Sequence, residues 1–191
     1  MKYAVGLGNP GKRYIDTRHN LGWWVLDSVG DRVGFGSERE RWTSLITRVP
    51  GRELTLVKPL TWMNASGRAV AAMIHETSAE LENVLIIMDD LALPVGTLRL
   101  RTGGSSGGHR GLQSVLDALG TEEVPRMRLG IGPCPPEQDS RDFVLSPFSD
   151  NQYETVEQMV AHGVDAVLCW LEESIESCMS RYNGTVETDE N

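Results

Sequence analysis

The stretch Val84-Leu85-Ile86-Ile87-Met88-Asp89-Asp90 is the most hydrophobic run of the chain, and it ends in two carboxylates. Its apolar residues do not alternate with polar ones, which is typical of a central strand covered on both faces. Such strands belong to open α/β sheets, which bind ligands beyond the carboxyl ends of their strands. We therefore predict an α/β fold, a single domain with a twisted mixed β-sheet flanked by helices, and a site close to Asp89.

The segments on either side of this run divide into strands and helices by the period of their apolar residues. We predict further strands over residues 3–8, 43–49, 53–58, 97–101 and 126–132, and helices over residues 19–33, 66–75, 112–119 and from residue 151 onward. Residues 102–109 are rich in glycine and serine and are predicted to be a loop. No repeat or linker divides the chain. We therefore expect one domain over residues 1–180 and an acidic, flexible tail over residues 181–191.

The charge of the chain is negative and unevenly distributed. The formal net charge is −9, of which −5 lies in residues 172–191, whereas residues 97–128 carry +2. Acidity argues against a nucleic-acid partner, but here it is mostly terminal and the middle of the chain is basic. In the strands at 97–101 and 126–132, apolar residues alternate with Arg99, Arg101, Arg126 and Arg128. If the two strands are close together, these arginines form one surface suited to phosphate; an ordinary solvated face fits the spacing equally well.

The composition also bears on where the chain works. No apolar run is long enough to span a bilayer, and no apolar segment follows Met1-Lys2-Tyr3, so we expect a cytoplasmic protein. The cysteines, Cys134, Cys169 and Cys178, lack metal-ligand spacing. They fit a reducing compartment, as thiols that are incidental to function.

Three short motifs resemble known sites but lack the context that each requires. The run Gly6-Leu7-Gly8-Asn9-Pro10-Gly11 matches a dinucleotide fingerprint, yet Pro10 and the polar residues 12–18 delay the helix that should receive a pyrophosphate. Read instead as a P-loop, it has Arg13 where a magnesium-binding hydroxyl belongs. Residues 103–107 match a nucleophile elbow around Ser105, but the loop is longer than that tight turn. A serine esterase is therefore a weak alternative.

Polar groups at the ends of predicted strands and helices form a better candidate site. His19 stands at the start of the first helix, Asp89 ends the central strand, and Asn9 and Asn64 follow other strands. Histidine can take a proton from water near neutral pH, and a carboxylate on its other ring nitrogen fixes its tautomer. Asparagine amides can donate hydrogen bonds to a developing oxyanion. With no cluster of metal-ligand spacing, this pattern favours hydrolysis without a metal or cofactor, although each residue alone also has a structural explanation.

Taken together, these residues resemble a known family, the bacterial-type peptidyl-tRNA hydrolases. The resemblance lies in four blocks whose order and spacing match: residues 5–14 with 17–22 (VGLGNPGKRY, TRHNLG), 58–67 (KPLTWMNASG), 89–96 (DDLALPVG) and 103–112 (GGSSGGHRGL). It covers nearly the whole chain and fades only in the acidic tail.

The resemblance implies hydrolysis of the ester that joins a peptide to the 3′-terminal ribose of peptidyl-tRNA, which recycles tRNA from abandoned translation. It implies His19 as the base, Asp89 as its partner and Asn9 as a further catalytic residue. It implies that Tyr14, Met63, Asn64 and Arg110 bind the substrate, and that Arg99, Arg101 and Arg128 hold tRNA phosphate. We expect a monomer that binds peptidyl-tRNA, with no membrane and no metal.

Two positions depart from the family pattern. Arg110 stands where the family commonly has asparagine, so a neutral amide contact there is replaced by a guanidinium. Ala92 stands where a second aspartate is common, which removes one carboxylate from the rim. The alternative to an enzyme is a non-catalytic RNA-binding scaffold on the same fold, but the presence of His19, Asp89, Asn9 and Asn64 favours the enzyme.

Overall fold

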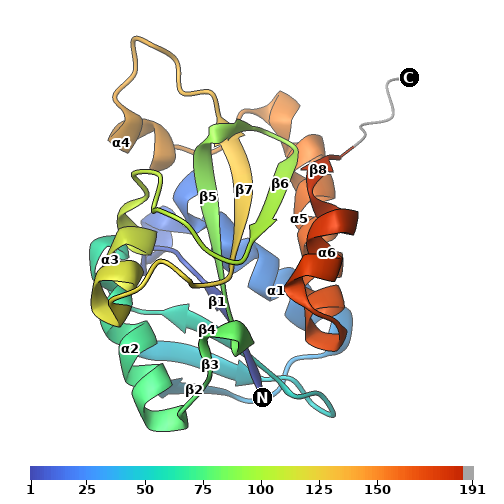
Figure 1. Cartoon of the computed structure of the whole chain (residues 1–191). Helices are drawn as coiled ribbons and strands as arrows, with labels where there is room; N and C mark the ends of the chain where they lie inside the picture. Colours follow the sequence, from blue (N-terminus) through green and yellow to red (C-terminus); the bar gives the residue numbers. More distant parts are fainter. Residues whose placement is uncertain (187–191) are drawn as a thin grey trace.

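An eight-stranded mixed sheet organises the chain (Figure 1). The computed structural model describes residues 1–186 and places the strands of this part in the order β2-β3-β4-β1-β5-β7-β6-β8. Their bounds are β1 Lys2–Gly6, β2 Glu38–Arg41, β3 Ser44–Arg48, β4 Leu54–Pro59, β5 Val84–Pro94, β6 Thr97–Arg101, β7 Arg126–Gly132 and β8 Gly184–Thr185. The inner strands β4, β1, β5 and β7 are parallel, and the outer strands pair antiparallel. The predicted α/β fold with a single mixed sheet is confirmed.

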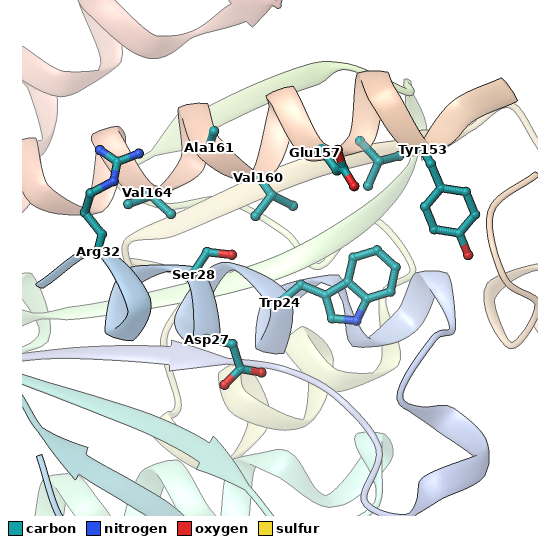
Figure 2. A pocket seen from close by; sticks show the side chains of 10 residues that line it. Trp24, Asp27, Ser28, Arg32, Tyr153, Glu157, Val160, Ala161 and Val164 are labelled. Carbon is teal, nitrogen blue, oxygen red and sulfur yellow. The ribbon is translucent and has the colours of Figure 1, made fainter. Parts of the chain in front are cut away.

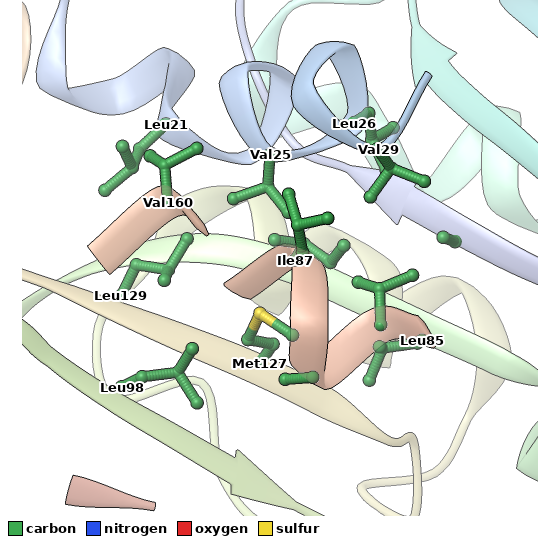
Figure 3. Close-up of a cluster of buried hydrophobic side chains, with 14 of the residues drawn as sticks. Leu21, Val25, Leu26, Val29, Leu85, Ile87, Leu98, Met127, Leu129 and Val160 are labelled. Carbon is green, nitrogen blue, oxygen red and sulfur yellow. The ribbon is translucent and has the colours of Figure 1, made fainter. Parts of the chain in front are cut away.

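The central strand β5 is buried on both faces, as its unbroken apolar run predicted. Leu85 and Ile87 belong to one hydrophobic cluster, whereas Val84, Ile86 and Met88 belong to another on the opposite face. Figure 3 shows Leu85 and Ile87 among side chains from α1, β7 and α5. Because successive side chains of a strand point to opposite faces, one strand contributes to both cores.

Helices cover both faces of the sheet (Figure 1). On one face lie α2 Ser66–Thr77 and α3 Arg110–Leu119; on the other lie α1 Leu21–Val33, α5 Tyr153–Glu172 and α6 Ile175–Tyr182. The short helix α4 Ser140–Val144 lies near the ends of the parallel strands. A groove of about 450 Å³ runs between α1 and α5, lined by Trp24 and Tyr153 at one end and Arg32 at the other (Figure 2). No helix in residues 1–186 is long and apolar enough to cross a membrane.

Close packing between strand and helix explains the glycine motif near the N-terminus. A Cβ added at Gly6 would come within 2.4 Å of the Gly22 carbonyl oxygen, and one added at Gly22 within 2.4 Å of the Ile87 carbonyl oxygen. Both distances are far below van der Waals contact, so only glycine lets α1 approach β1 and β5 this closely. The motif that resembles a dinucleotide fingerprint therefore serves helix–strand packing.

The C-terminal segment differs from the prediction. We expected a flexible tail from residue 181 onward, but Arg181 and Tyr182 belong to α6 and residues 184–185 form β8. The interpretation of the cysteines as incidental thiols is wrong for two of them, because Cys169 on α5 and Cys178 on α6 form a disulfide. The two cysteines are nine residues apart, a spacing that does not by itself predict a disulfide. They meet because α6 folds back along α5. The remainder of the predicted tail, residues 187–191, lies outside the described residues.

Candidate active site

A cleft of about 660 Å³ lies beyond the ends of the parallel strands β4 and β1 and beside the middle of β5, which continues past Asp89 to Pro94. Its lining includes Asn9 from the loop after β1, Met63 and Asn64 from the turn after β4, and Asp89 from β5. In the sheet, β4 lies on one side of β1 and β5 on the other, so the chain crosses over β1 between these two strands. Open α/β sheets bind ligands at such a switch point. The structure thus brings the predicted strand-end residues into one cavity.

Two histidines hold the buried carboxylate of Asp89. The Nδ1 atom of His19 lies 2.9 Å from Oδ1 and 3.1 Å from Oδ2 of Asp89. The Nε2 atom of His109 lies 3.0 Å from the same Oδ1. Asp89 is only 1% exposed, so its charge depends on these two partners in place of water.

The hydrogen bonds define the tautomer of each ring. An ionised carboxylate only accepts hydrogen bonds, so His19 donates from Nδ1 and His109 donates from Nε2. The other nitrogen of His109, Nδ1, accepts the backbone N–H of Leu112 at 3.1 Å and caps the start of α3. No group in residues 1–186 hydrogen-bonds Nε2 of His19. In neutral His19, this nitrogen therefore has its lone pair available, and the His19 side chain lines the cleft.

The pKa values follow from this arrangement. Burial would raise the pKa of Asp89, but the charges and hydrogen bonds of His19 and His109 outweigh it and hold that pKa well below its usual range. Burial would lower the pKa of His19, but the Asp89 carboxylate raises it, against a smaller opposing effect of Arg110. Asp89 therefore stays ionised and stabilises the imidazolium that forms when His19 takes a proton.

Among the described residues, His19, Asp89 and His109 are the group whose ligand atoms could surround a metal ion, since they lie within 4.8 Å of one another. The tautomer of His109 does not fit this role. To bind a metal through Nε2, neutral His109 would carry its proton on Nδ1, where it would oppose the Leu112 N–H. The three side chains therefore fit a hydrogen-bonded relay better than a metal site.

The loop that carries Asn9 is fixed from two directions. Asn20 accepts the Asn9 N–H with Oδ1 at 2.9 Å and donates from Nδ2 to the Asn9 carbonyl at 3.0 Å. The Asn9 side-chain oxygen accepts the Met63 N–H at 2.9 Å. Because the oxygen faces Met63, the amide nitrogen of Asn9 is left as a donor on a side chain that lines the cleft.

The mouth of the cleft combines aromatic and polar groups. Tyr14 packs edge-to-face on Trp62, with ring centroids 5.9 Å apart, and Trp62 is 54% exposed. Asn64 and Arg110 also line this part of the cleft. All four residues that the resemblance implied for substrate binding, Tyr14, Met63, Asn64 and Arg110, therefore lie around one cavity.

The four arginines of β6 and β7 are neighbours but do not share one role. The register pairs Arg99 with Arg128 and Arg101 with Arg126, which confirms that the two strands adjoin. However, Arg126 is 2% exposed and donates to the carbonyls of Gly104 and Glu122 at 2.6 and 3.1 Å, so it anchors the glycine loop. The expectation of a basic surface made of all four is therefore wrong for Arg126.

The other three arginines remain accessible. Arg99 and Arg101 are exposed, and half-buried Arg128 donates from Nε to Asp90. None of the three is among the residues that line the cleft. They form a separate basic strip beside it.

A second buried arginine holds the opposite wall of the cleft. The guanidinium of Arg18 lies 4.4 Å from the ring centroids of both Phe143 and Phe148, and donates to Gln152 at 3.0 Å. The Arg18 backbone N–H also donates to the Ser146 carbonyl at 3.0 Å. Through these contacts, the turn that carries His19 is joined to α4, which lines the cleft.

Sequence reasoning missed the roles of His109 and Arg18, and it gave Asn20, which stands beside His19, no role of its own. His109 was assigned to a flexible loop, although its position directly before an apolar helical stripe is a helix-cap position. Arg18 precedes His19, but its contacts with residues 143–152 leave no local signal, and the hydrogen bonds of Asn20 to the Asn9 backbone depend on how the loop after β1 folds. The rival nucleophile Ser105 has no hydrogen bond to a histidine among the described residues; His162 instead bonds the Tyr182 carbonyl at 3.1 Å.

Comparisons with known proteins point to one family. Residues 3–190 match the sequence profile described as peptidyl-tRNA hydrolase. The peptidyl-tRNA hydrolase of Moorella thermoacetica is 46% identical over 183 residues, covering 94% of this chain and 96% of that protein. That of Syntrophomonas wolfei is 40% identical over 185 residues, covering 96% and 100%. The crystal structure of peptidyl-tRNA hydrolase from Acinetobacter baumannii superposes with a TM-score of 0.89 at 28% identity, covering 97% of this chain and 95% of that one.

Proposed function

The chain belongs to the peptidyl-tRNA hydrolase family, and from this premise we propose that it hydrolyses the ester between a peptide and the 3′-terminal ribose of tRNA. The reaction would recycle tRNA from abandoned translation. The observation that carries the proposal is His19, whose Nδ1 is held by buried Asp89 while the side chain lines the cleft. The non-catalytic RNA-binding scaffold is not favoured, because such a protein has no need of this relay.

The reaction follows from the groups around the cleft. Nε2 of His19 takes a proton from water, and the water oxygen attacks the ester carbonyl carbon. The resulting oxyanion accepts a hydrogen bond from the Asn9 amide, which Met63 and Asn20 hold in place. The tetrahedral intermediate then expels the ribose 3′-oxygen, which takes the proton from the His19 imidazolium. Asp89 remains ionised throughout and lowers the energy of that imidazolium.

Binding would be divided between the cleft and the strip beside it. Tyr14, Met63, Asn64 and Arg110 would hold the peptide and the 3′-terminal nucleotide, because they surround the ester site. Arg99, Arg101 and Arg128 would hold tRNA phosphates, because they lie outside the cleft on adjoining strands. Each phosphate contact would make binding depend on salt.

The same proposal covers partners and location. The cleft is built from one chain, so we propose that a monomer suffices for catalysis. We propose hydrolysis without a metal or cofactor, because the hydrogen-bonded His19–Asp89–His109 arrangement already supplies base and orientation. A substrate produced in translation would place the protein in the cytoplasm.

The test is hydrolysis of N-acetylaminoacyl-tRNA by the purified full chain, with Ser105→Ala as the comparison. We expect wild type and Ser105→Ala to release deacylated tRNA at equal rates, since Ser105 lies outside the relay. Binding of tRNA without cleavage by wild type would support the scaffold instead. Loss of activity in Ser105→Ala would support the serine esterase.

A further inference from the structure

Three arginines that have no ion-pair partner within residues 1–186 line the catalytic cleft. Arg13 comes from the turn Lys12–Tyr14, Arg110 from the start of α3, and Arg141 from α4. All three are exposed. They come from segments far apart in the sequence, and the fold brings them to one cavity in a chain whose net charge is −9.

The guanidinium groups of this trio are available to a ligand. Within residues 1–186, no carboxylate lies within 4.0 Å of any of them, whereas Arg32, Arg41, Arg52, Arg128 and Arg181 each have such a partner. Asp139, the acidic residue nearest in sequence before Arg141, uses its side chain to cap α4. Arg13 stacks over the Tyr14 ring at 4.6 Å, which orients the guanidinium plane.

The position of Arg110 is unfavourable for stability. It is the first residue of the ten-residue helix α3, where the helix dipole already places positive charge. It also opposes protonation of His19, whose pKa it lowers. A cation that stabilises neither the helix nor its neighbour fits a binding role, because an anion at this place would interact favourably with both the guanidinium and the helix terminus.

We propose that Arg13, Arg110 and Arg141 form an anion site for the phosphodiesters of the last nucleotides of the tRNA 3′ end. The proposal rests on the proposed function. The ester and the nearest phosphodiester belong to the same terminal nucleotide, so a cleft that receives the ester also meets that phosphate. Arginine binds phosphate oxygens through paired N–H groups. This site is distinct from the strip of Arg99, Arg101 and Arg128, which lies outside the cleft.

The experiment uses three esters of one N-acetylated amino acid: on adenosine, which has no phosphate; on the trinucleotide CCA; and on full-length tRNA. Wild type, Arg13→Gln and Arg141→Gln are assayed on each. We expect each variant to lose about fivefold to tenfold in kcat/KM on the CCA ester and on tRNA, as loss of one charge-assisted contact implies. On the adenosine ester each variant should stay within about twofold of wild type, because no phosphate is present. The dependence of KM for the CCA ester on salt should also weaken, by about 0.7 in the logarithmic slope per arginine.

Arg32→Gln is the matched control, since Arg32 lies in the groove between α1 and α5 and pairs with Asp165. It should leave all three substrates unchanged. Equal losses on the adenosine and CCA esters would overturn the proposal, because the arginines would then act on the peptide or on the chemistry. Unchanged rates on the CCA ester would overturn it as well. If wild type cleaved none of the three esters, the proposed function itself would fail.

Discussion

The cleft that holds His19 and the groove between α1 and α5 (Figure 2) are two hollows of the molecule that differ in how their polar groups are used. In the groove, Arg32 pairs with Asp165 at 3.1 Å, and the Trp24 indole N–H donates to the Ile15 carbonyl at 2.7 Å. In the cleft, Nε2 of His19 and the amide nitrogen of Asn9 have no partner that the described residues supply. The groove also has polar groups without a hydrogen bond among the described residues, such as the Ser28 hydroxyl and the Glu157 carboxylate, but neither residue is buried, whereas His19 and Asn9 are.

This difference separates a functional hollow from a packing defect between helices. Buried polar groups normally find partners within the protein, so those left over beside a cavity need a ligand. The cleft also holds its free groups rigidly, because Asp89, Met63 and Asn20 fix the other ends of His19 and Asn9. Substitutions in the two hollows should therefore have very different effects on activity.

The largest effect is expected for His19→Ala. Removing the base should lower kcat for N-acetylaminoacyl-tRNA by about a thousandfold, the range typical of general base catalysis, while tRNA binding is retained. Ser28→Ala in the groove is the matched control and should leave kcat unchanged, since Ser28 lines only the groove. Single-turnover assays with a metal chelator present would measure both variants. A fully active His19→Ala variant would contradict the expectation that substitutions lower kcat in the cleft but not in the groove.

Asp89→Asn should have the next largest effect. The amide would no longer hold the Nδ1–H tautomer of His19 by its charge, and we expect kcat to fall by about a hundredfold. The Asp89 carboxylate raises the pKa of His19, so its loss lowers that pKa. The acid limb of kcat/KM against pH, where His19 gains its proton, should therefore move to lower pH. An acid limb that stays in place would mean that Asp89 does not tune His19.

Arg18→Met tests whether the walls of the cleft are held from behind. The methionine keeps apolar volume between Phe143 and Phe148 but loses the hydrogen bond to Gln152. We expect the free energy of unfolding to fall by about 2 kcal/mol, with faster amide hydrogen exchange in residues 139–148. Arg32→Met in the groove removes an exposed ion pair and should cost about 0.5 kcal/mol or less. Equal losses in the two variants would contradict the anchoring role of Arg18.

The smallest effect is expected on the strip outside both hollows. Arg99→Gln and Arg101→Gln should each weaken binding of full-length tRNA and reduce the logarithmic salt slope by about 0.9. Arg52→Gln, at the far turn between β3 and β4, is the comparison and should not change the slope. Fluorescence titration across a range of salt concentrations measures this directly. An unchanged slope in the Arg99 and Arg101 variants would show that the strip is only a solvated surface.

Several strands and two of the site residues could be predicted from the sequence because their signals are local. The unbroken run of β5 and the alternation in β6 and β7 are local patterns, and the structure confirms the strands that they predicted. His19 was recognised because it stands at the start of a predicted helix, and Asp89 because it follows the apolar run; the prediction that Asp89 ends the strand is wrong, since β5 continues to Pro94. The role of Arg126 was missed because alternation gives the face of a strand but not what covers it, and here the glycine loop covers it.

The other omissions arise from contacts between distant segments. His109 reaches Asp89 across 20 residues, and Arg18 reaches Gln152 across 134. The disulfide between Cys169 and Cys178 depends on the turn between α5 and α6, which the polar composition of the C-terminal segment concealed. The strand β2, with its alternating charges Glu38-Arg39-Glu40-Arg41, was missed because it lacks the apolar residues that identify a strand.

The central claim is that Asp89 holds the proton of His19 on Nδ1 and leaves Nε2 as the base. Long-range ¹H–¹⁵N NMR of the imidazole rings, at a pH above the titration of His19, tests it directly. We expect His19 to be the Nδ1–H tautomer and His109 to be the opposite, Nε2–H tautomer. The ring signals assigned to His109 should disappear in the His109→Asn variant, which checks the assignment. A proton on Nε2 of His19 under these conditions would contradict the account, because that nitrogen could not then take a proton from water.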